Sequence, residues 1–256
     1  MLLKRVIPIL LLDNSGLVKT IGFSQRRYIG DPINIAQIFS DKGVDELVIF
    51  DIDASRLSIE PSFDKLKIIA EQCFVPLGYG GGITSIDQAR RIFGMGYEKV
   101  FIGNAAAKNL NLIEQLASQF GRQAVVGVVN VKSSFWGNKR VYNYVKGQFF
   151  SFSIVEYAKA LVLAGAGEIL LSVVDRDGKY LGLDSDLVSE ISNAVNVPII
   201  ISGGCSSVEN VNQGLRAGAA AVAAGSLFIY AGRHKAVLVN YPHDSILNRS
   251  EIAKLK

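Results

Sequence analysis

The sequence predicts one closed (β/α)8 barrel over residues 1–256. Three observations lead to this fold class. Short runs rich in Val, Ile and Leu alternate with amphipathic stretches, which is typical of β-α-β units on a parallel sheet. Eight such runs can be identified, and eight parallel strands close a barrel. The two halves of the chain also repeat each other, which indicates two equivalent half-barrels that face one another.

Each predicted strand is a short apolar segment, and each predicted helix carries apolar residues at helical spacing. The apolar residues 6–12 follow two cations, as in a signal peptide, but Pro8 interrupts them and no small-residue cleavage site precedes Asp13. A buried first strand is therefore the better interpretation. The predicted strands are 4–12, 46–51, 75–79, 99–102, 124–130, 168–174, 198–202 and 220–224, and the predicted helices are 33–42, 64–72, 85–93, 110–120, 154–163, 185–194 and 208–216.

A hairpin is predicted at residues 133–147, SSFWGNKRVYNYVKG, because aromatic and polar residues alternate about Gly137 and Asn138. Trp136 and Tyr144 are expected to pack on the barrel rim. Covering the barrel mouth or contacting a third protein are the alternatives.

The internal repeat has a constant offset of 122 residues. An open, doubly wound sheet would not require such a repeat, so the closed barrel is preferred. The matched pairs are Pro76 with Pro198, Gly81 with Gly203, Gly82 with Gly204, Gly96 with Gly218, Gly103 with Gly225, Glu46 with Glu168, and Asp53 with Asp175.

Glycine-containing turns follow two strands in each half of the chain. Backbone N–H groups can approach an anion where no Cβ intervenes, and a following helix N-terminus favours negative charge. The loops after strands 7 and 8 of such barrels commonly bind phosphate, and here the loops after strands 3 and 4 duplicate them. We therefore expect a small molecule with a phosphate at each end. The candidate phosphate-binding residues are Gly81, Gly82, Gly103 and Asn104 in the first half, and Gly203, Gly204, Gly225 and Ser226 in the second.

Composition argues against several classes of function. The net charge is +4, but the cations form only short groups at 25–27 and 138–140, so we expect no nucleic-acid partner. No run approaches the roughly 20 apolar residues of a membrane span, so no membrane partner is expected. The two cysteines form no CxxC pair, which favours a cytoplasmic protein. His234 and His243 lie in the C-terminal tail, so we expect no metal, no cofactor and no histidine base.

Several stretches carry a resemblance to a known family. They are MLLKRVIP at the start, GDP at 30–32, DELVIFDIDAS at 45–55, GGGI at 80–83, GAGEILL at 165–171, DRDG at 175–178 and SGG at 202–204. Along nearly its whole length the chain resembles the cyclase subunit of imidazole glycerol phosphate synthase. The resemblance implies a (β/α)8 barrel with a glutaminase partner at its N-terminal face. It also implies that ammonia from the glutaminase passes through the barrel to a bisphosphate ligand at the C-terminal face.

The resemblance also implies a channel entrance ringed by charges at the N-terminal ends of alternate strands. The matching residues are Arg5, Glu46, Lys99 and Glu168, and all four keep the charge of the family. A salt-bridge layer that only stabilises the barrel is the alternative. Lys19, in the long loop after strand 1, matches the mobile-loop lysine of the family.

The chain departs from the family where the cyclase chemistry takes place. The resemblance implies a carboxylate at the end of strand 1 and another at the end of strand 5, but these positions hold Leu11 and Asn130. Neither leucine nor a carboxamide serves as a general base near neutral pH. Asp13 lies two residues beyond Leu11 and is a candidate substitute. Two further departures, at Gly103 and Asn104, alter one phosphate cradle.

Four functional hypotheses follow from these residues. The opening IPILLLDNSGLVKTIGF is similar to cyclase-like paralogues associated with surface-polysaccharide sugar amidation, which implies a conduit that supplies ammonia to a third, ATP-dependent amidotransferase, without efficient cyclase activity. The second hypothesis is an authentic histidine-pathway cyclase that works through Asp13, Asp51 or Asp177. The third is the related isomerase, which also relies on the two missing carboxylates. The fourth is a binding module without turnover.

Overall fold

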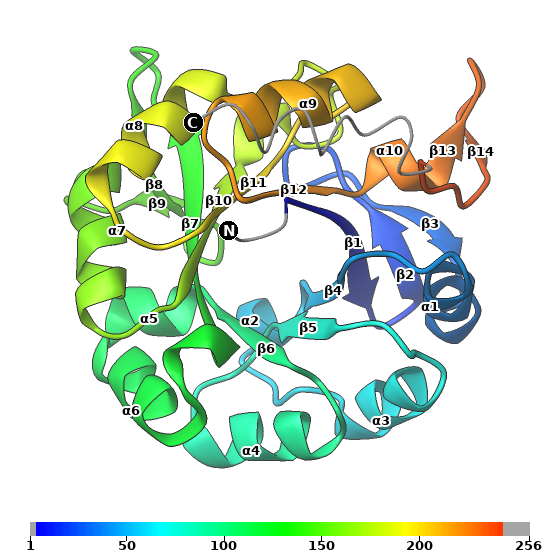
Figure 1. Cartoon of the computed structure of the whole chain (residues 1–256), viewed down its shortest axis with the longest axis horizontal. Helices are drawn as coiled ribbons and strands as arrows, with labels where there is room; N and C mark the ends of the chain where they lie inside the picture. The colour runs from blue at the N-terminus through cyan, green and yellow to red at the C-terminus, as the bar shows by residue number, and fades with distance from the viewer. Residues whose placement is uncertain (1–3, 243–256) are drawn as a thin grey trace.

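Eight parallel strands close into a barrel in the computed structural model, which describes residues 4–242 (Figure 1). His243 lies outside the described residues. The strands pair in chain order, and pairing of Arg5 with Ala221 joins the last strand to the first. The predicted (β/α)8 fold is therefore confirmed. The barrel strands are β1 (Arg5–Asp13), β4 (Leu47–Asp51), β5 (Leu77–Gly80), β6 (Lys99–Ile102), β7 (Val125–Ser133), β10 (Glu168–Val173), β11 (Ile199–Ser202) and β12 (Ala221–Ala224).

Helices surround the barrel and bury their apolar faces against its outer surface (Figure 1). All seven predicted helices are present: α1 (Pro32–Asp41), α3 (Phe63–Glu71), α4 (Ile86–Gly94), α6 (Asn111–Phe120), α7 (Ile154–Leu163), α8 (Ser185–Ala194) and α9 (Val208–Arg216). Shorter helices follow three of the strands: α2 (Ala54–Leu57), α5 (Asn104–Lys108) and α10 (Ser226–Ile229). No helix of the described residues is both long and apolar enough to cross a membrane.

Antiparallel extensions decorate the C-terminal end of the barrel. Strands β2 (Gly16–Lys19) and β3 (Arg27–Gly30) form a hairpin on β1, where the sequence analysis expected only a long loop. The predicted hairpin after strand 5 is present: the end of β7 turns at Gly137 and Asn138 into β8 (Lys139–Asn143), and β9 (Gln148–Phe149) adds a third strand. A last small hairpin joins β13 (Tyr230–Ala231) to β14 (Ala236–Val237).

The internal repeat is visible in the backbone. Gly81 and Gly203 have φ values of 128° and 105°, and the matched pair Gly82 and Gly204 has 69° and 91°. A Cβ on Gly81 would meet the carbonyl oxygen of Asp51 at 2.4 Å. On Gly203 it would meet that of Val173, which lies 122 residues beyond Asp51, at 2.5 Å. The two half-barrels therefore use glycine at these turns for the same steric reason.

The inside of the barrel is apolar and tightly filled. A separate cluster of buried residues lines it, including Ile7, Val126 and Ile200. The rings of Phe50 and Phe101 meet edge to face, with their centroids 5.3 Å apart. They fit because both inward positions of β5 are glycine. A Cβ on Gly78 would lie 2.6 Å from Phe101, and one on Gly80 would lie 2.5 Å from Phe50.

Candidate functional site

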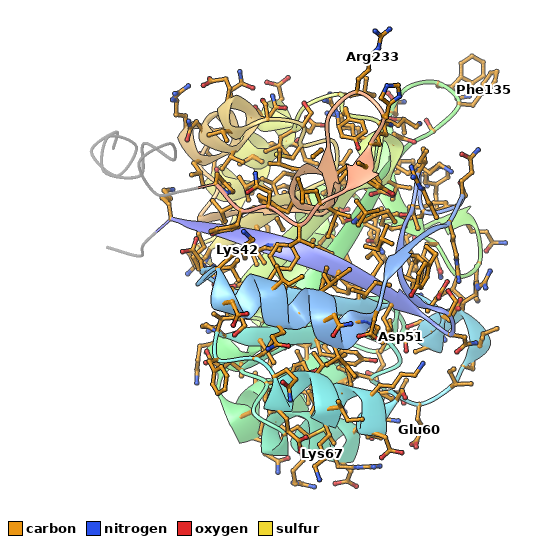
Figure 2. All side chains as sticks on the ribbon, turned by 90° about the vertical axis from the view of Figure 1, so that its right-hand side faces the viewer. Lys42, Asp51, Glu60, Lys67, Phe135 and Arg233 are labelled. Atoms are coloured by element: carbon orange, nitrogen blue, oxygen red, sulfur yellow. The ribbon has the colours of Figure 1, made fainter. Side chains whose placement is uncertain are left out.

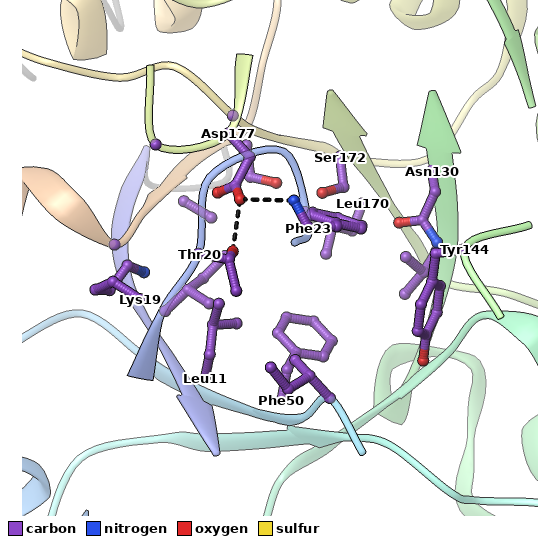
Figure 3. Close-up of a pocket in the computed structure, with 18 of the residues that line it drawn as sticks. Leu11, Lys19, Thr20, Phe23, Phe50, Asn130, Tyr144, Leu170, Ser172 and Asp177 are labelled. Carbon is purple, nitrogen blue, oxygen red and sulfur yellow. Dashed lines mark hydrogen bonds between the residues drawn. The ribbon is translucent and has the colours of Figure 1, made fainter. Parts of the chain in front are cut away.

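A cavity of about 390 Å³ opens at the C-terminal ends of the barrel strands (Figure 3). It gathers residues from both halves of the chain, as the repeat predicted. The predicted site residues that line it are Lys19, Asp51, Asn130, Asp177, Gly81, Gly103, Asn104, Gly203, Gly204, Gly225 and Ser226. Two predicted residues, Asp13 and Gly82, do not line this cavity.

The floor of the cavity carries no carboxylate at the two positions where the resemblance implies one. Leu11 and Asn130 point inward from opposite sides of the barrel, with Phe50 and Leu170 between them (Figure 3). Asn130 is buried on β7 and pairs in register with Ser172 of β10. A hydrocarbon and an amide thus occupy the places expected for two proton-transfer groups.

Asp13 does not line the cavity, and its carboxylate is already engaged. One oxygen accepts hydrogen bonds from the backbone N–H and the hydroxyl of Ser15, and the other pairs with Arg26 at 3.2 Å. Arg26 also forms a bidentate pair with Asp53. The prediction that Asp13 replaces the missing strand-1 acid is therefore not supported, since the side chain fixes a turn and an ion pair.

Asp51 and Asp177 do line the cavity, but each also has a structural role. Oδ1 of Asp51 accepts the backbone N–H groups of Asp53 and Ala54 at the start of α2. Burial raises the pKa of the Asp51 carboxyl above its ordinary value, and these two hydrogen bonds oppose that change. Asp177 accepts the Thr20 hydroxyl at 2.6 Å and the Phe23 N–H at 3.3 Å, which fastens the β2–β3 loop across the mouth.

Lys19 lies at the end of strand β2, not in a loop, and its side chain is buried. Its ammonium fills the space above Gly225, where a Cβ would lie only 1.7 Å from Nζ. Burial lowers the pKa of Lys19, while the charge of Asp177 works in the opposite direction. The second glycine cradle thus already holds a cation that can meet an anionic ligand.

We expect Lys19→Met to stabilise the protein while weakening the binding of inorganic phosphate by about 10- to 100-fold, the loss of one charge-assisted hydrogen bond. Because the folded-state pKa is lowered, the unfolded chain binds more protons between that pKa and 10.5. The gain in stability should therefore be largest below the folded-state pKa and should fade as pH rises toward 10.5. Thermal melts across this pH range and phosphate titrations measure the two effects. A Lys19→Met variant that is less stable at neutral pH would contradict the expectation.

Gly82 lines a second cavity of about 330 Å³ outside the first. Ser55 and Asn104 line both cavities, so the first cradle opens toward two spaces. Nδ2 of Asn104 is buried and has no hydrogen-bond partner among the described residues. An amide donor therefore remains available at the first cradle, where the predicted phosphate would lie.

The close backbone approach at the glycine turns should make them sensitive to an added Cβ. Gly203→Ala should destabilise the protein by roughly 1–3 kcal/mol, because Ala at φ 105° is strained and its Cβ would strike the Val173 carbonyl. Gly96→Ala is the matched control, since its φ is 99° but no atom lies within 4 Å of the added Cβ. Denaturant unfolding should show a larger loss for Gly203→Ala than for the control. Equal losses would show that the close approach is unimportant.

The four predicted gate residues form a closed ring of ion pairs at the N-terminal end of the barrel. Arg5 contacts Glu46 at 2.5 Å and Glu168 at 2.7 Å, and Lys99 contacts the same carboxylates at 2.8 and 3.1 Å. Burial of the Arg5 guanidinium disfavours its charge, but the two carboxylates more than offset this and raise its pKa. Both carboxylates are buried.

The sequence analysis expected the four ring residues to lie on alternate strands, but the structure departs from this pattern. Glu46 immediately precedes the second barrel strand, Lys99 and Glu168 begin the fourth and sixth, and Arg5 begins the first. Neighbouring strands of a barrel are staggered, and Ile9 pairs with Val48. This stagger allows the long Arg5 side chain to complete the ring from a neighbouring strand.

Several residues of the mouth were not among the predicted site residues. Phe23 and Tyr144 line the cavity and meet edge to face across it, with centroids 6.1 Å apart. Tyr144 was expected to pack on the rim, but it covers the mouth, which was one of the alternatives. Arg26 and Tyr180 also line the cavity. All four lie in loops or hairpins whose path across the mouth has no periodic signal in the sequence.

A closed barrel with duplicated glycine turns at its mouth and a charge ring at its base defines a class of half-barrel-repeat proteins suited to an anionic small molecule. The family model for "Histidine biosynthesis protein" matches residues 5–235. The chain belongs to this family, and within it to the group of imidazole glycerol phosphate synthase subunits of the HisF type.

Individual relatives cover almost the whole chain. A protein of Pseudomonas aeruginosa, provisionally named imidazole glycerol phosphate synthase subunit hisF2, is 46% identical over 94% of this chain and 97% of its own. One of Vibrio vulnificus, provisionally named subunit hisF3, is 44% identical over 96% and 95%. The imidazole glycerol phosphate synthase subunit HisF of Exiguobacterium sibiricum is 36% identical over 89% and 91%.

Proposed function

We propose that this chain is the barrel subunit of a glutamine amidotransferase complex that conducts ammonia without efficient cyclase activity. A glutaminase docks at the N-terminal face, and its ammonia crosses the barrel to the mouth. There a ligand with two phosphate groups is held between the glycine cradles. The observation that carries the proposal is the intact charge ring at one end of a barrel whose other end presents Leu11 and Asn130.

In this proposal each group of the site has a role. The cradles at Gly81 and Gly203 offer backbone N–H groups to the ligand's anionic ends, and Lys19 adds a positive charge at the second cradle. The apolar bore keeps charged ammonium and water out of the barrel. The ligand then serves as an allosteric signal to the glutaminase, since neither Leu11 nor Asn130 can move a proton for ring closure.

We further propose that the ammonia passes to a second enzyme. The acceptor is a separate ATP-dependent amidotransferase that amidates a surface-polysaccharide sugar. Support comes from the opening segment IPILLLDNSGLVKTIGF and from the likeness to relatives that bear the numbered names hisF2 and hisF3.

The test uses the chain purified together with its glutaminase. We expect no appreciable imidazole glycerol phosphate when the bisphosphate aminoimidazole precursor is supplied with ammonium, although the same precursor stimulates glutamine hydrolysis. Co-expression with an ATP-dependent amidotransferase from the same gene cluster should then give glutamine-dependent amidation. Efficient ring closure by the isolated barrel would overturn the proposal.

A second candidate is an authentic histidine-pathway cyclase that works through Asp51. This candidate is favoured by a cavity-lining carboxyl whose pKa is raised by burial, as a general acid requires. Complementation of a cyclase-deficient auxotroph separates the two functions. Growth with the wild-type chain but not with Asp51→Asn would establish the second candidate.

A further inference from the structure

The hairpin after β7 carries two aromatic side chains that nothing in the described structure covers. Phe135 is 96% exposed and Trp136 is 84% exposed, and they lie edge to face with their centroids 5.5 Å apart. Figure 2 shows Phe135 beyond the ribbon, at the end of the molecule where Asp51 and Glu60 mark the barrel mouth. The expected packing of Trp136 on the barrel rim is therefore wrong. Two adjacent exposed aromatics present apolar surface of the kind that anchors interfaces.

Hydrogen bonds order the backbone of the hairpin that carries these aromatics. Ser133 pairs with Lys139 in the ladder, Ser134 donates its N–H to the Asn138 carbonyl at 2.8 Å, and Gly137 supplies the positive φ that the turn requires. At its base, Lys139 pairs with Asp184 at 2.6 Å. Because the hairpin is already ordered, binding through its tip costs little conformational entropy.

The apolar tip continues into a basic surface around the mouth. Asp184 joins the hairpin to the loop that carries Leu181, which is 62% exposed. Tyr180 in the same loop contacts the β13–β14 hairpin, since the Lys235 ammonium lies 4.5 Å from the centroid of its ring. We call this surface the aromatic rim. It comprises Phe135, Trp136 and Leu181 with the cations Arg140, Lys179, Arg233 and Lys235.

The rim has an excess of positive charge. Its four cations are exposed, and none of the ion pairs found in residues 4–242 involves any of them. Arg140 does donate to the Phe150 carbonyl, which leaves its charge uncompensated. Of the nearby carboxylates, Asp184 pairs with Lys139, whereas Asp175 accepts the Ser133 N–H and keeps its charge, so the unpaired cations of the rim still outnumber it. Such a surface is complementary to an acidic one.

We propose that the aromatic rim docks a protein with an acidic surface, and that this protein is the enzyme that accepts the ammonia. This inference rests on the proposed function and names the surface that the partner uses. The rim borders the mouth, so a partner seated on it receives ammonia where the barrel ends. Phe135 and Trp136 are its apolar anchors, and the cations set its orientation. A protein fits better than a flat membrane surface because the mouth must stay open to its small ligand.

The closing experiment uses the full chain in complex with its glutaminase, together with the purified amidotransferase of the same gene cluster. Glutamine-dependent amidation is measured against the concentration of the barrel complex. Phe135→Ser/Trp136→Ser should raise the concentration needed for half-maximal amidation by about 30-fold or more, as expected for two interface hot spots. Stimulation of the glutaminase at the opposite face should not change. Ile68→Ser on α3, an exposed apolar residue far from the rim, is the matched control and should behave as wild type.

A second measurement observes the tip itself. Trp136 is the only tryptophan of the chain, so 5-fluorotryptophan labelling of this chain gives one ¹⁹F resonance. The amidotransferase should shift it, and Phe135→Ser should weaken that titration. If the double variant needed the same concentration as wild type for half-maximal amidation, the docking would be overturned. A resonance that shifts only with anionic phosphatidylglycerol vesicles, or only with the concentration of the chain itself, would overturn it as well.

Failure of the proposed function looks different from failure of the docking. If the wild-type complex gives no glutamine-dependent amidation, the proposed function fails, and the ¹⁹F titration alone decides whether the rim binds the enzyme. If wild type and double variant amidate equally well, ammonia supply stands and the docking inference fails.

Discussion

Under the proposed function, installing two carboxylates should create ring-closure activity well above that of the wild-type chain. In the Leu11→Asp/Asn130→Asp variant, an acid and a base project into the cavity from opposite sides of the barrel (Figure 3). General acid–base groups contribute roughly 10²–10⁴-fold each, so the double variant should exceed wild type by about four orders of magnitude or more if both groups act. Product formation from the bisphosphate aminoimidazole precursor and ammonium measures the effect.

The control for this gain is Leu11→Asn/Asn130→Asp, which differs from the active variant only by a carboxyl group. It should remain far below the double-aspartate variant, because Asn cannot transfer the proton. Asp51 is left unchanged throughout. If wild type already turned over as fast as the double-aspartate variant, the two positions would have no catalytic importance and another cavity carboxylate would be responsible.

Breaking the charge ring should be the most destabilising single change at the barrel base. Glu46 is 2% exposed, and its Oε2 accepts hydrogen bonds from both Arg5 and Lys99. Glu46→Gln leaves two cations facing one remaining carboxylate, with a cost of about 3 kcal/mol, since removal of one partner of a buried pair typically costs 3–5 kcal/mol. For a chain of this size the melting temperature should fall by roughly 6–12 °C.

An exposed ion pair supplies the comparison. Asp87 pairs with Arg90 on the surface of α4, and Asp87→Asn should cost only about 0–1 kcal/mol. Similar losses for Glu46→Gln and Asp87→Asn would mean that water already screens the ring. A stabilising layer and a channel entrance both predict the stability loss. Only the channel entrance predicts a change in the ratio of nitrogen delivered to glutamine hydrolysed.

The barrel was predictable because its signals are local and periodic. Strand β1 and helix α4 follow from apolar spacing, and the glycines at 81 and 203 follow from a repeat that the backbone obeys. The β2–β3 hairpin was missed because its strands are only four residues long. They are held by the pairing of β2 with β1 and with β3, which leaves no periodic pattern in the local sequence.

The candidate site was predictable at positions that the fold itself fixes. The ring charges sit at strand starts and the cradles at strand ends, so their placement follows from register. The fate of Asp13 did not follow, because strand parity placed it near Leu11 but could not show that Ser15 and Arg26 hold its carboxylate. Trp136 was misjudged for a related reason, since a hairpin pattern does not reveal whether its tip meets the barrel.

Under the proposed function, the paired rings of Phe50 and Phe101 affect how fast ammonia can cross the barrel. They line the inner end of the cavity where it meets the apolar cluster inside the barrel, and the glycines of β5 give them space. A small neutral molecule can pass only when the rings swing apart, and rearrangements of a packed interior take roughly microseconds to milliseconds. A typical enzyme turns over only about ten times per second. If ammonia crosses the barrel as proposed, the interior would open far more often than an acceptor enzyme needs, and its tight packing would not limit the rate of nitrogen delivery.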